Sequence, residues 1–172
     1  MWLFWLLSIV ILAFGFVVFF GAPYVPSKRK ELKQAFETLY TPSKKDTVVD
    51  IGSGDGVVLR MAAAYGARAV GYELNPLLAL ISNLLSRNDK RVSTQVANFW
   101  LVRLPEETTF VYVFAVSRDI KRIADKIQKE VNRIGKPLRL MTYGSEIPGK
   151  VPIATLGAHN LYDFAPLQET KA

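Results

Sequence analysis

A turn rich in glycine and aspartate is the feature that most constrains how this chain folds. Residues 50–56 read Asp-Ile-Gly-Ser-Gly-Asp-Gly, between a short apolar run at 47–51 and a helical pattern at 57–65. Glycine has no Cβ, so its backbone can turn sharply and approach a ligand closely. A strand, such a turn and a helix in this order are typical of an open parallel α/β sheet with a ligand site at the turn.

The rest of the chain continues this alternation of strands and helices. Two final strands follow each other without a helix, which indicates an antiparallel edge on an otherwise parallel sheet. The fold class is therefore α/β, a Rossmann-like sandwich around a mostly parallel seven-stranded sheet. Apolar spacing predicts helices over 27–40, 57–65, 75–85 and 119–133, and strands over 47–51, 67–73, 91–97, 110–116, 138–143, 152–156 and 158–164.

The N-terminal segment predicts a transmembrane helix over residues 1–22. Residues 1–20 carry no charged side chain. Twenty helical residues rise about 30 Å, the thickness of the hydrocarbon core of a bilayer. A cleaved signal peptide is the competing interpretation, but no basic residue precedes the apolar run. Aromatic side chains that favour the membrane interface lie near both ends of the run: Trp2, Trp5, Phe19 and Phe20.

Charge sets the expected orientation and the domain boundaries. Basic residues follow the apolar run at positions 28, 29, 30 and 33, and none precedes it. The positive-inside rule then places the N-terminus outside and the catalytic domain in the cytoplasm of a single-pass membrane protein. We expect a transmembrane helix at 1–22, a linker and a helix that precedes the domain at 23–46, and the folded domain at 47–172.

Composition excludes several kinds of chemistry. The chain has no cysteine and one histidine, His159, so disulfides, thiolate metal sites and Cys-His pairs are impossible. We expect no metal. The formal net charge is +7, but acidic residues are interspersed along most of the chain, so the charge favours a solvated surface over nucleic-acid binding.

The acidic residues around the turn indicate which ligand it binds. A dinucleotide site would carry a third glycine at position 57, where this chain has Val57. Asp50 and Asp55 would repel a pyrophosphate and suit a cationic ligand. Glu73 ends the next predicted strand, where a carboxylate can accept both hydroxyls of a ribose. S-adenosylmethionine, with a sulfonium and an ammonium group, meets these requirements.

Two segments together resemble the class I S-adenosylmethionine-dependent methyltransferases: residues 50–56, and residues 69–76, which read Ala-Val-Gly-Tyr-Glu-Leu-Asn-Pro. More narrowly, the chain is similar to the archaeal-type protein lysine methyltransferases. It is also similar to the mitochondrial membrane enzymes that methylate lysine on ATP synthase and on the adenine nucleotide translocase. Tyr-Val-Pro-Ser at 24–27 matches a stretch of those enzymes. The resemblance covers about residues 24–116.

The resemblance implies S-adenosyl-L-methionine as cofactor and a lysine side chain of a protein as methyl acceptor. It implies that Asp50 and the glycines hold the methionine part and that Glu73 holds the ribose. Asn98 stands where the family has an acid facing the adenine. No catalytic side chain is assigned, since desolvation beside the sulfonium can deprotonate a lysine. The predicted cofactor-binding residues are Tyr24, Asp50, Gly52, Ser53, Gly54, Gly56, Glu73, Leu74, Asn98 and Phe99.

The expected function is thus protein-lysine N-methylation by an enzyme anchored in the lipid bilayer through its N-terminal helix. Three alternatives stay open: an RNA methyltransferase, a small-molecule or lipid methyltransferase, and an inactive membrane-tethered protein that binds the cofactor. Two departures from the family motivate the last of these: Asn98, and the loop at 115–119 on the acceptor side.

Overall fold

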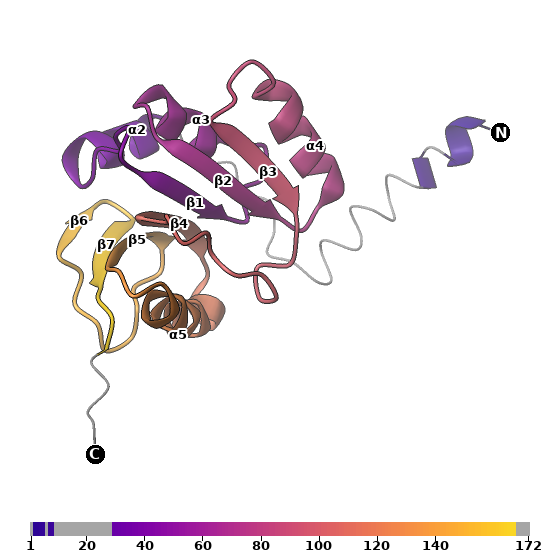
Figure 1. Ribbon diagram of the computed structural model, residues 1–172. Coiled ribbons are helices and arrows are strands. Elements are labelled where there is room, and N and C mark those ends of the chain that lie inside the picture. The colour runs from indigo at the N-terminus through magenta and orange to yellow at the C-terminus, as the bar shows by residue number, and fades with distance from the viewer. Residues whose placement is uncertain (1, 6, 9–28, 168–172) are drawn as a thin grey trace.

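The computed structural model describes residues 2–5, 7–8 and 29–167, most of which form an open sheet covered by helices on both faces (Figure 1). The helices are α2 (Arg29–Thr38), α3 (Val57–Ala64), α4 (Pro76–Leu85) and α5 (Ser117–Ile134). The strands are β1 (Thr47–Ile51), β2 (Arg68–Glu73), β3 (Val92–Val96), β4 (Phe110–Ala115), β5 (Leu138–Gly144), β6 (Ala154–Leu156) and β7 (His159–Phe164).

The seven strands lie in the order β3-β2-β1-β4-β5-β7-β6. Strands β1 to β5 pair in parallel, while β7 runs antiparallel to both β5 and β6. This confirms the mostly parallel sheet with an antiparallel edge. The order reverses between β1 and β4, and such a reversal opens a crevice at the carboxyl ends of the strands. The first glycine-rich turn therefore lies where an α/β sheet binds ligands.

Alternate residues of the central strands serve two separate cores. In β1, Val48 packs with α2 and α3, whereas Val49 packs with α5 and the loop that follows β3. Every residue of β1 is buried, as expected for a strand covered on both faces. Figure 1 shows α2, α3 and α4 on one face of the sheet and α5 on the other.

Helix α3 comes close to β2 because Gly71 has no side chain. A Cβ on Gly71 would lie 2.4 Å from Oγ of Ser53 and 2.7 Å from Cδ1 of Leu59. Ser53 belongs to the turn and Leu59 to α3, so this glycine sets the distance between the sheet and the ligand-site turn. Glycine is required here for close approach rather than for an unusual backbone angle.

The first helix of the domain is tied to the carboxyl end of β5. Tyr143 Oη donates a hydrogen bond of 2.9 Å to Oε2 of Glu31, in the first turn of α2. His159 packs edge-on against Tyr143, with 4.8 Å between the ring centroids. The start of α2 is therefore held at the carboxyl ends of the strands, where the glycine-rich turn also lies.

Most predicted elements are found within one or two residues of their expected bounds. Helix α5 begins at Ser117 rather than at residue 119, because Val116 takes the extended N-cap conformation. Within the part of the chain that the structure describes, no helix has both the length and the apolar character that crossing a membrane requires. Most of the predicted transmembrane helix, together with Tyr24 and Ser27, lies outside the described residues.

Replacing Gly71 with alanine is expected to lower the free energy of unfolding by about 1–3 kcal/mol, the usual cost of overpacking a tight core. The added Cβ would collide with Ser53 and Leu59, neither of which can retreat into solvent. Urea denaturation measures the loss. Arg68→Ala is the control in the same strand, because the Arg68 side chain is exposed, and its effect should stay within about 1 kcal/mol. Equal stability of the two variants would contradict this packing argument.

Candidate active site

Three glycines with left-handed backbone angles build the turn after β1. Gly52, Gly54 and Gly56 have φ values of 74°, 53° and 79°, which residues with a Cβ rarely adopt. The amide of Gly52 donates to the carbonyl of Tyr72 at 2.9 Å, which fastens the turn to β2. No atom lies within 4 Å of the position that a Cβ on Gly52 would take. Gly52 therefore presents bare backbone to open space.

Glu73 joins the turn to the start of α4. Its Oε2 accepts a hydrogen bond from the Gly54 amide and its Oε1 accepts one from the Asn75 amide, both at 2.8 Å. Asn75 in turn caps α4, because its Oδ1 accepts from the Leu77 amide at 2.9 Å. Glu73 is buried, yet each carboxylate oxygen can accept a second hydrogen bond. The side chain can thus hold the loop and still bind a ligand hydroxyl.

Asp50 lies buried at the end of β1, directly before the turn. Burial raises the pKa of Asp50 well above its ordinary value, and the negative charges of Glu73 and Asp55 raise it further. Asp55 faces its own counter-ion, because its Oδ2 lies 3.6 Å from Nη2 of Arg60. The turn therefore concentrates negative charge that a cationic ligand would relieve.

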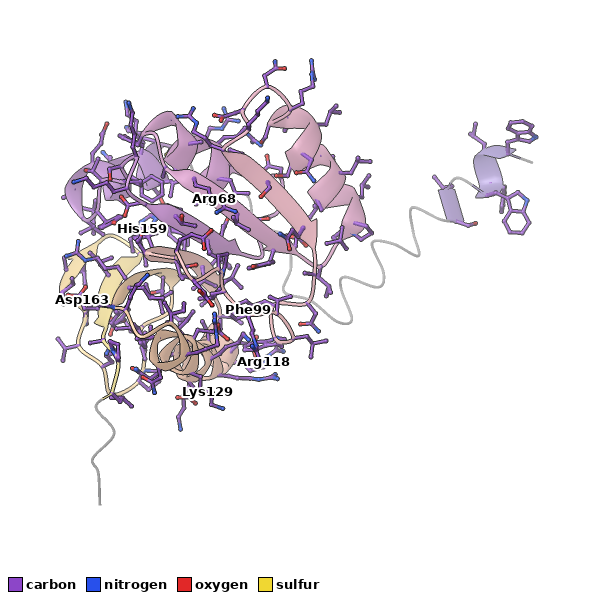
Figure 2. All side chains as sticks on the ribbon, in the orientation of Figure 1. Arg68, Phe99, Arg118, Lys129, His159 and Asp163 are labelled. Atoms are coloured by element: carbon purple, nitrogen blue, oxygen red, sulfur yellow. The ribbon has the colours of Figure 1, made fainter. Side chains whose placement is uncertain are left out.

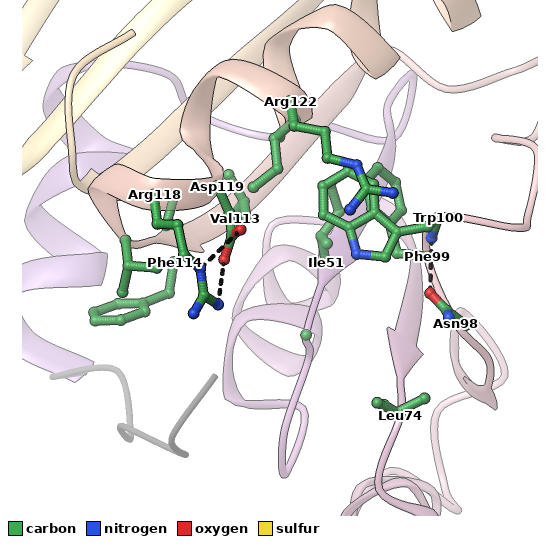
Figure 3. A pocket seen from close by; sticks show the side chains of 14 residues that line it. Ile51, Leu74, Asn98, Phe99, Trp100, Val113, Phe114, Arg118, Asp119 and Arg122 are labelled. Carbon is green, nitrogen blue, oxygen red and sulfur yellow. Dashed lines mark hydrogen bonds and ion pairs between the residues drawn. The ribbon is translucent and has the colours of Figure 1, made fainter. Parts of the chain in front are cut away.

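The loop after β3 carries an amide and two aromatic rings. Oδ1 of Asn98 accepts a hydrogen bond from the Trp100 amide at 3.0 Å, which shapes the loop. Phe99 is buried beside it, with 5.5 Å between the Phe99 and Trp100 ring centroids. The guanidinium of Arg122, from α5, lies over the indole of Trp100 at 4.0 Å from the ring centroid (Figure 3). Such cation–π contacts stabilise exposed rings by about 0.5–1 kcal/mol.

A cavity of about 370 Å³ opens between this loop, the turn and the start of α5 (Figure 3). Its size lies in the range of small-molecule sites. Most of its lining residues are apolar, and its charged or amide side chains are those of Asn98, Arg118, Asp119 and Arg122. The lining residues are Ile51, Gly52, Leu74, Asn98, Phe99, Trp100, Val113, Phe114, Ala115, Val116, Arg118, Asp119, Arg122 and Ile123.

The structure brings nine of the ten predicted site residues to the carboxyl ends of β1, β2 and β3. Four of them line the cavity: Gly52, Leu74, Asn98 and Phe99. Asp50 and Gly54 belong to the end of β1 and the turn that follows it, and Glu73, at the end of β2, accepts the hydrogen bond from the Gly54 amide. The tenth, Tyr24, lies outside the described residues.

Two of the nine have packing roles that the sequence did not predict. The side chain of Ser53 is buried over Gly71, and its Oγ has no hydrogen-bond partner among the described residues. A Cβ on Gly56 would lie 2.1 Å from Oγ of Ser82 in α4. Both residues therefore fix how closely the helices approach the turn.

Sequence reasoning missed the contribution of α5 to the cavity. Arg118, Asp119 and Arg122 line it, and Arg118 forms a 2.9 Å ion pair with Asp119. Arg118 and Asp119 were expected in a loop at the acceptor side, and Arg122 had no predicted role. The signal that could have found them is the spacing of Arg118 and Arg122, which places both cations on one face of a helix that starts at the carboxyl end of β4. Figure 2 shows Arg118 and Phe99 near the same end of the molecule.

A second cluster of titratable side chains surrounds His159, on the face of the sheet opposite α5. His159 is buried, with its Nε2 3.2 Å from Oη of Tyr112. Burial lowers the pKa of His159, and the charge of Glu31 acts in the opposite direction. Tyr143 of this cluster stacks on Phe114, a wall of the cavity, with 5.5 Å between the ring centroids. Among the described residues, no group of three His, Asp or Glu side chains is arranged to hold a metal ion.

Comparison with known sequences finds relatives that match 112 residues of the chain. The chain is 34% identical over 112 residues to the ATP synthase C-subunit lysine N-methyltransferase of Xenopus laevis, a match that covers 63% of this chain and 48% of that protein. The corresponding human protein is 31% identical over 112 residues, covering 63% and 47%. The chain thus spans about half the length of the curated relatives it matches. No family model matches it.

Comparison with solved structures identifies the fold. An RNA methyltransferase from Salinibacter ruber superposes with a TM-score of 0.73 at 19% identity, covering 86% of this chain and 98% of that one. Coclaurine N-methyltransferase superposes with a TM-score of 0.55 at 18% identity, covering 64% and 34%. The chain therefore has the Rossmann-like fold of the class I methyltransferases.

Replacing Asp50 with asparagine is expected to stabilise the ligand-free protein at pH 7. A carboxyl whose pKa is raised on folding favours the folded state at low pH and loses that contribution as the pH rises through the raised value. The gain should therefore shrink as the pH falls toward 3.8, the ordinary pKa of aspartate. Thermal unfolding between pH 4 and pH 7 measures it, with Asp125→Asn on the exposed face of α5 as control. A gain that is independent of pH would contradict the assigned charge effect.

Proposed function

We propose that this chain binds S-adenosyl-L-methionine and transfers its methyl group to the amine of a lysine in a protein. The observation that carries the proposal is the acidic, glycine-lined turn, in which Glu73 is fixed between Gly54 and Asn75 next to the cavity. The named lysine N-methyltransferases to which the chain is similar support it, as does the class I methyltransferase fold.

The residues of the site fit this cofactor. Gly52 lines the cavity with open space beside its backbone, which accommodates close contact with the amino-acid part of the cofactor, and the buried Asp50 lies two residues before it. Glu73 keeps lone pairs for the two hydroxyls of a ribose. Oδ1 of Asn98 can accept from an adenine amino group in addition to the Trp100 amide. When bound, the cofactor supplies an electrophilic methyl group on a sulfonium.

The acceptor amine must lose its proton before it can form the new C–N bond as the C–S bond breaks. Free lysine has a pKa of about 10.4, so the site must favour the neutral amine. The apolar wall formed by Ile51, Val113 and Phe114 disfavours a charged ammonium, and the guanidinium groups of Arg118 and Arg122 repel it. These residues lower the pKa of an incoming lysine, so no dedicated protein base is needed.

The membrane anchor is part of the same proposal. The uncharged run at 1–20 suits a single transmembrane helix, and the basic residues after it favour a cytoplasmic catalytic domain with the N-terminus outside. The described part of this run exposes large apolar side chains, among them Trp2, Phe4 and Trp5. An enzyme held this way would meet lysines on membrane proteins or close to the bilayer.

The direct test is transfer of a radiolabelled methyl group from S-adenosyl-L-methionine to membranes by the purified full chain. Acid hydrolysis should release the label as N-methylated lysine. In calorimetry, Glu73→Ala should weaken cofactor binding by about 1–3 kcal/mol, or roughly 5- to 150-fold, because ribose hydroxyls lose their acceptor. Asn98→Asp should tighten binding, since a carboxylate accepts from the adenine amino group more strongly than an amide does.

Glu107→Ala is the matched control, because the Glu107 carboxylate is exposed on the domain surface. Label recovered on RNA or lipid would replace lysine as the acceptor. Cofactor binding without any transfer would identify an inactive binding protein, and unchanged affinity in Glu73→Ala would overturn the assigned site.

Placing a charge in the middle of the apolar run should release the protein from membranes. Ile11→Lys puts an ammonium at the centre of the proposed span, which costs about 3 kcal/mol of insertion free energy. Extraction of membranes at alkaline pH should leave the parent chain and the control Ile11→Leu in the pellet and move a large fraction of Ile11→Lys to the supernatant. Equal retention of all three would refute a transmembrane anchor.

A further inference from the structure

Helix α4 has small residues on its inward side and large apolar residues on its outward side. Its inward side carries the small residues Ala79 and Ser82, which are 1% and 0% exposed. Its outward side carries Leu80, Leu84 and Leu85, each 56–64% exposed, and Leu77, which is 37% exposed. We call these four residues the leucine stripe. A surface helix normally buries its leucines and exposes its polar residues, so the stripe needs a separate explanation.

The inward side of α4 is fixed by the site turn. Oγ of Ser82 lies 2.6 Å from Oγ1 of Thr94 in β3, and the same oxygen occupies the space that a side chain on Gly56 would need. A leucine at position 82 would therefore push α4 away from the turn. This contact explains the small inner residues, but it places no demand on the outer ones, whose leucines are left in contact with solvent.

Apolar exposure continues past the leucine stripe toward the cavity end of the sheet. Val96, the last residue of β3, is 59% exposed, and Leu101, in the loop that also carries Asn98, is 83% exposed. Exposed apolar residues that gather in this way mark interaction surfaces, whereas scattered ones do not. Exposed apolar side chains are thus found on α4, at the end of β3 and in the loop that lines the cavity.

Strand β3 lies at the edge of the sheet under α4, and its backbone cannot pair with a further strand. Nδ2 of Asn83 donates to the Thr94 carbonyl at 2.8 Å, and the Thr94 amide donates to Oδ1 of Asn83 at 2.9 Å. One side chain thus occupies the outward backbone groups at the middle of β3, which blocks pairing with a second sheet edge. A partner for this surface must therefore contact side chains rather than backbone.

Positive charge flanks the leucine stripe. Arg87 and Lys90 follow the end of α4 and are exposed. Arg29, Lys30 and Lys33 are exposed farther along the same face of the sheet, on α2, from which α3 separates α4 (Figure 1). Leucines on an outward helix face with cations around them are the composition of helices that lie in the interface of anionic bilayers.

We propose that α4 lies on the surface of an anionic lipid bilayer, with the leucine stripe inserted among the acyl chains near the headgroups. The proposal rests on the membrane anchor proposed above, which would hold the domain close enough for this contact. Glu73 and Leu74 immediately precede α4, so the contact would bring the cavity to the membrane surface. A lysine that emerges just outside the bilayer would then be in reach.

Site-directed labelling tests the contact without interference, because the chain contains no cysteine. The full chain with Leu80→Cys or Leu84→Cys is labelled with an environment-sensitive fluorophore and reconstituted in vesicles of phosphatidylcholine and phosphatidylglycerol. Val151→Cys is the matched control, since Val151 is an exposed apolar residue before β6, at the opposite edge of the sheet. Lipids that carry a quencher near the headgroup then report contact with the bilayer.

We expect quenching at positions 80 and 84 to be several times stronger than at position 151, and to weaken when phosphatidylglycerol is omitted. Equal quenching at all three positions would overturn the proposal. A fluorescence shift at position 80 that follows protein concentration, without lipid quenching, would also overturn it and would assign the stripe to a second copy. Cofactor calorimetry on the same labelled proteins tests the site separately, and sedimentation with the vesicles tests the anchor separately.

Discussion

The carboxylate of Glu73 is the group on which the rest of the site depends. Its two oxygens accept from the amides of Gly54, in the turn after β1, and of Asn75, in the β2–α4 connection. Asn75 then caps α4, and α4 places Ser82 against Gly56. A single buried acid therefore determines the shape of the turn, the start of the next helix and the distance between them. Burying a charge is costly unless it is hydrogen-bonded, so few side chains could replace Glu73 at this position.

Concentrating acids at one turn has a cost that the ligand can remove. Asp50 lies close enough to Glu73 and Asp55 for their charges to raise its pKa. A cationic ligand would offset this repulsion. On the other side of the cavity, α5 contributes guanidinium groups, and Arg122 rests on Trp100. The acidic turn thus adjoins the cavity at Gly52, and the guanidinium groups of α5 line the cavity itself.

The sequence was sufficient to predict the sheet and the turn because both follow from local patterns. Short apolar runs separated by helical periodicity predict parallel strands, and the glycines at 52, 54 and 56 need the left-handed angles that they adopt. The inward position of Ser53 and the stacking of Arg122 on Trp100 could not be predicted. The first depends on Gly71 in another strand, and the second joins two segments that meet only in the folded chain. The position of Leu80 on the outer side of α4 follows from a close contact at Ser82, which also has no local signal.

The bond between Tyr143 and Glu31 has a consequence for how the domain can be held. It fixes the first turn of α2 beside Phe114, a wall of the cavity, through the stacked rings of Tyr143 and Phe114. The polypeptide therefore enters the domain at the rim of the cavity rather than at its back. In the proposed membrane-anchored enzyme, the anchor would join the domain at this point, so the number of residues between the apolar run and α2 would set how far the site can reach from the bilayer. Lengthening that stretch would widen the range of lysines that the site could reach.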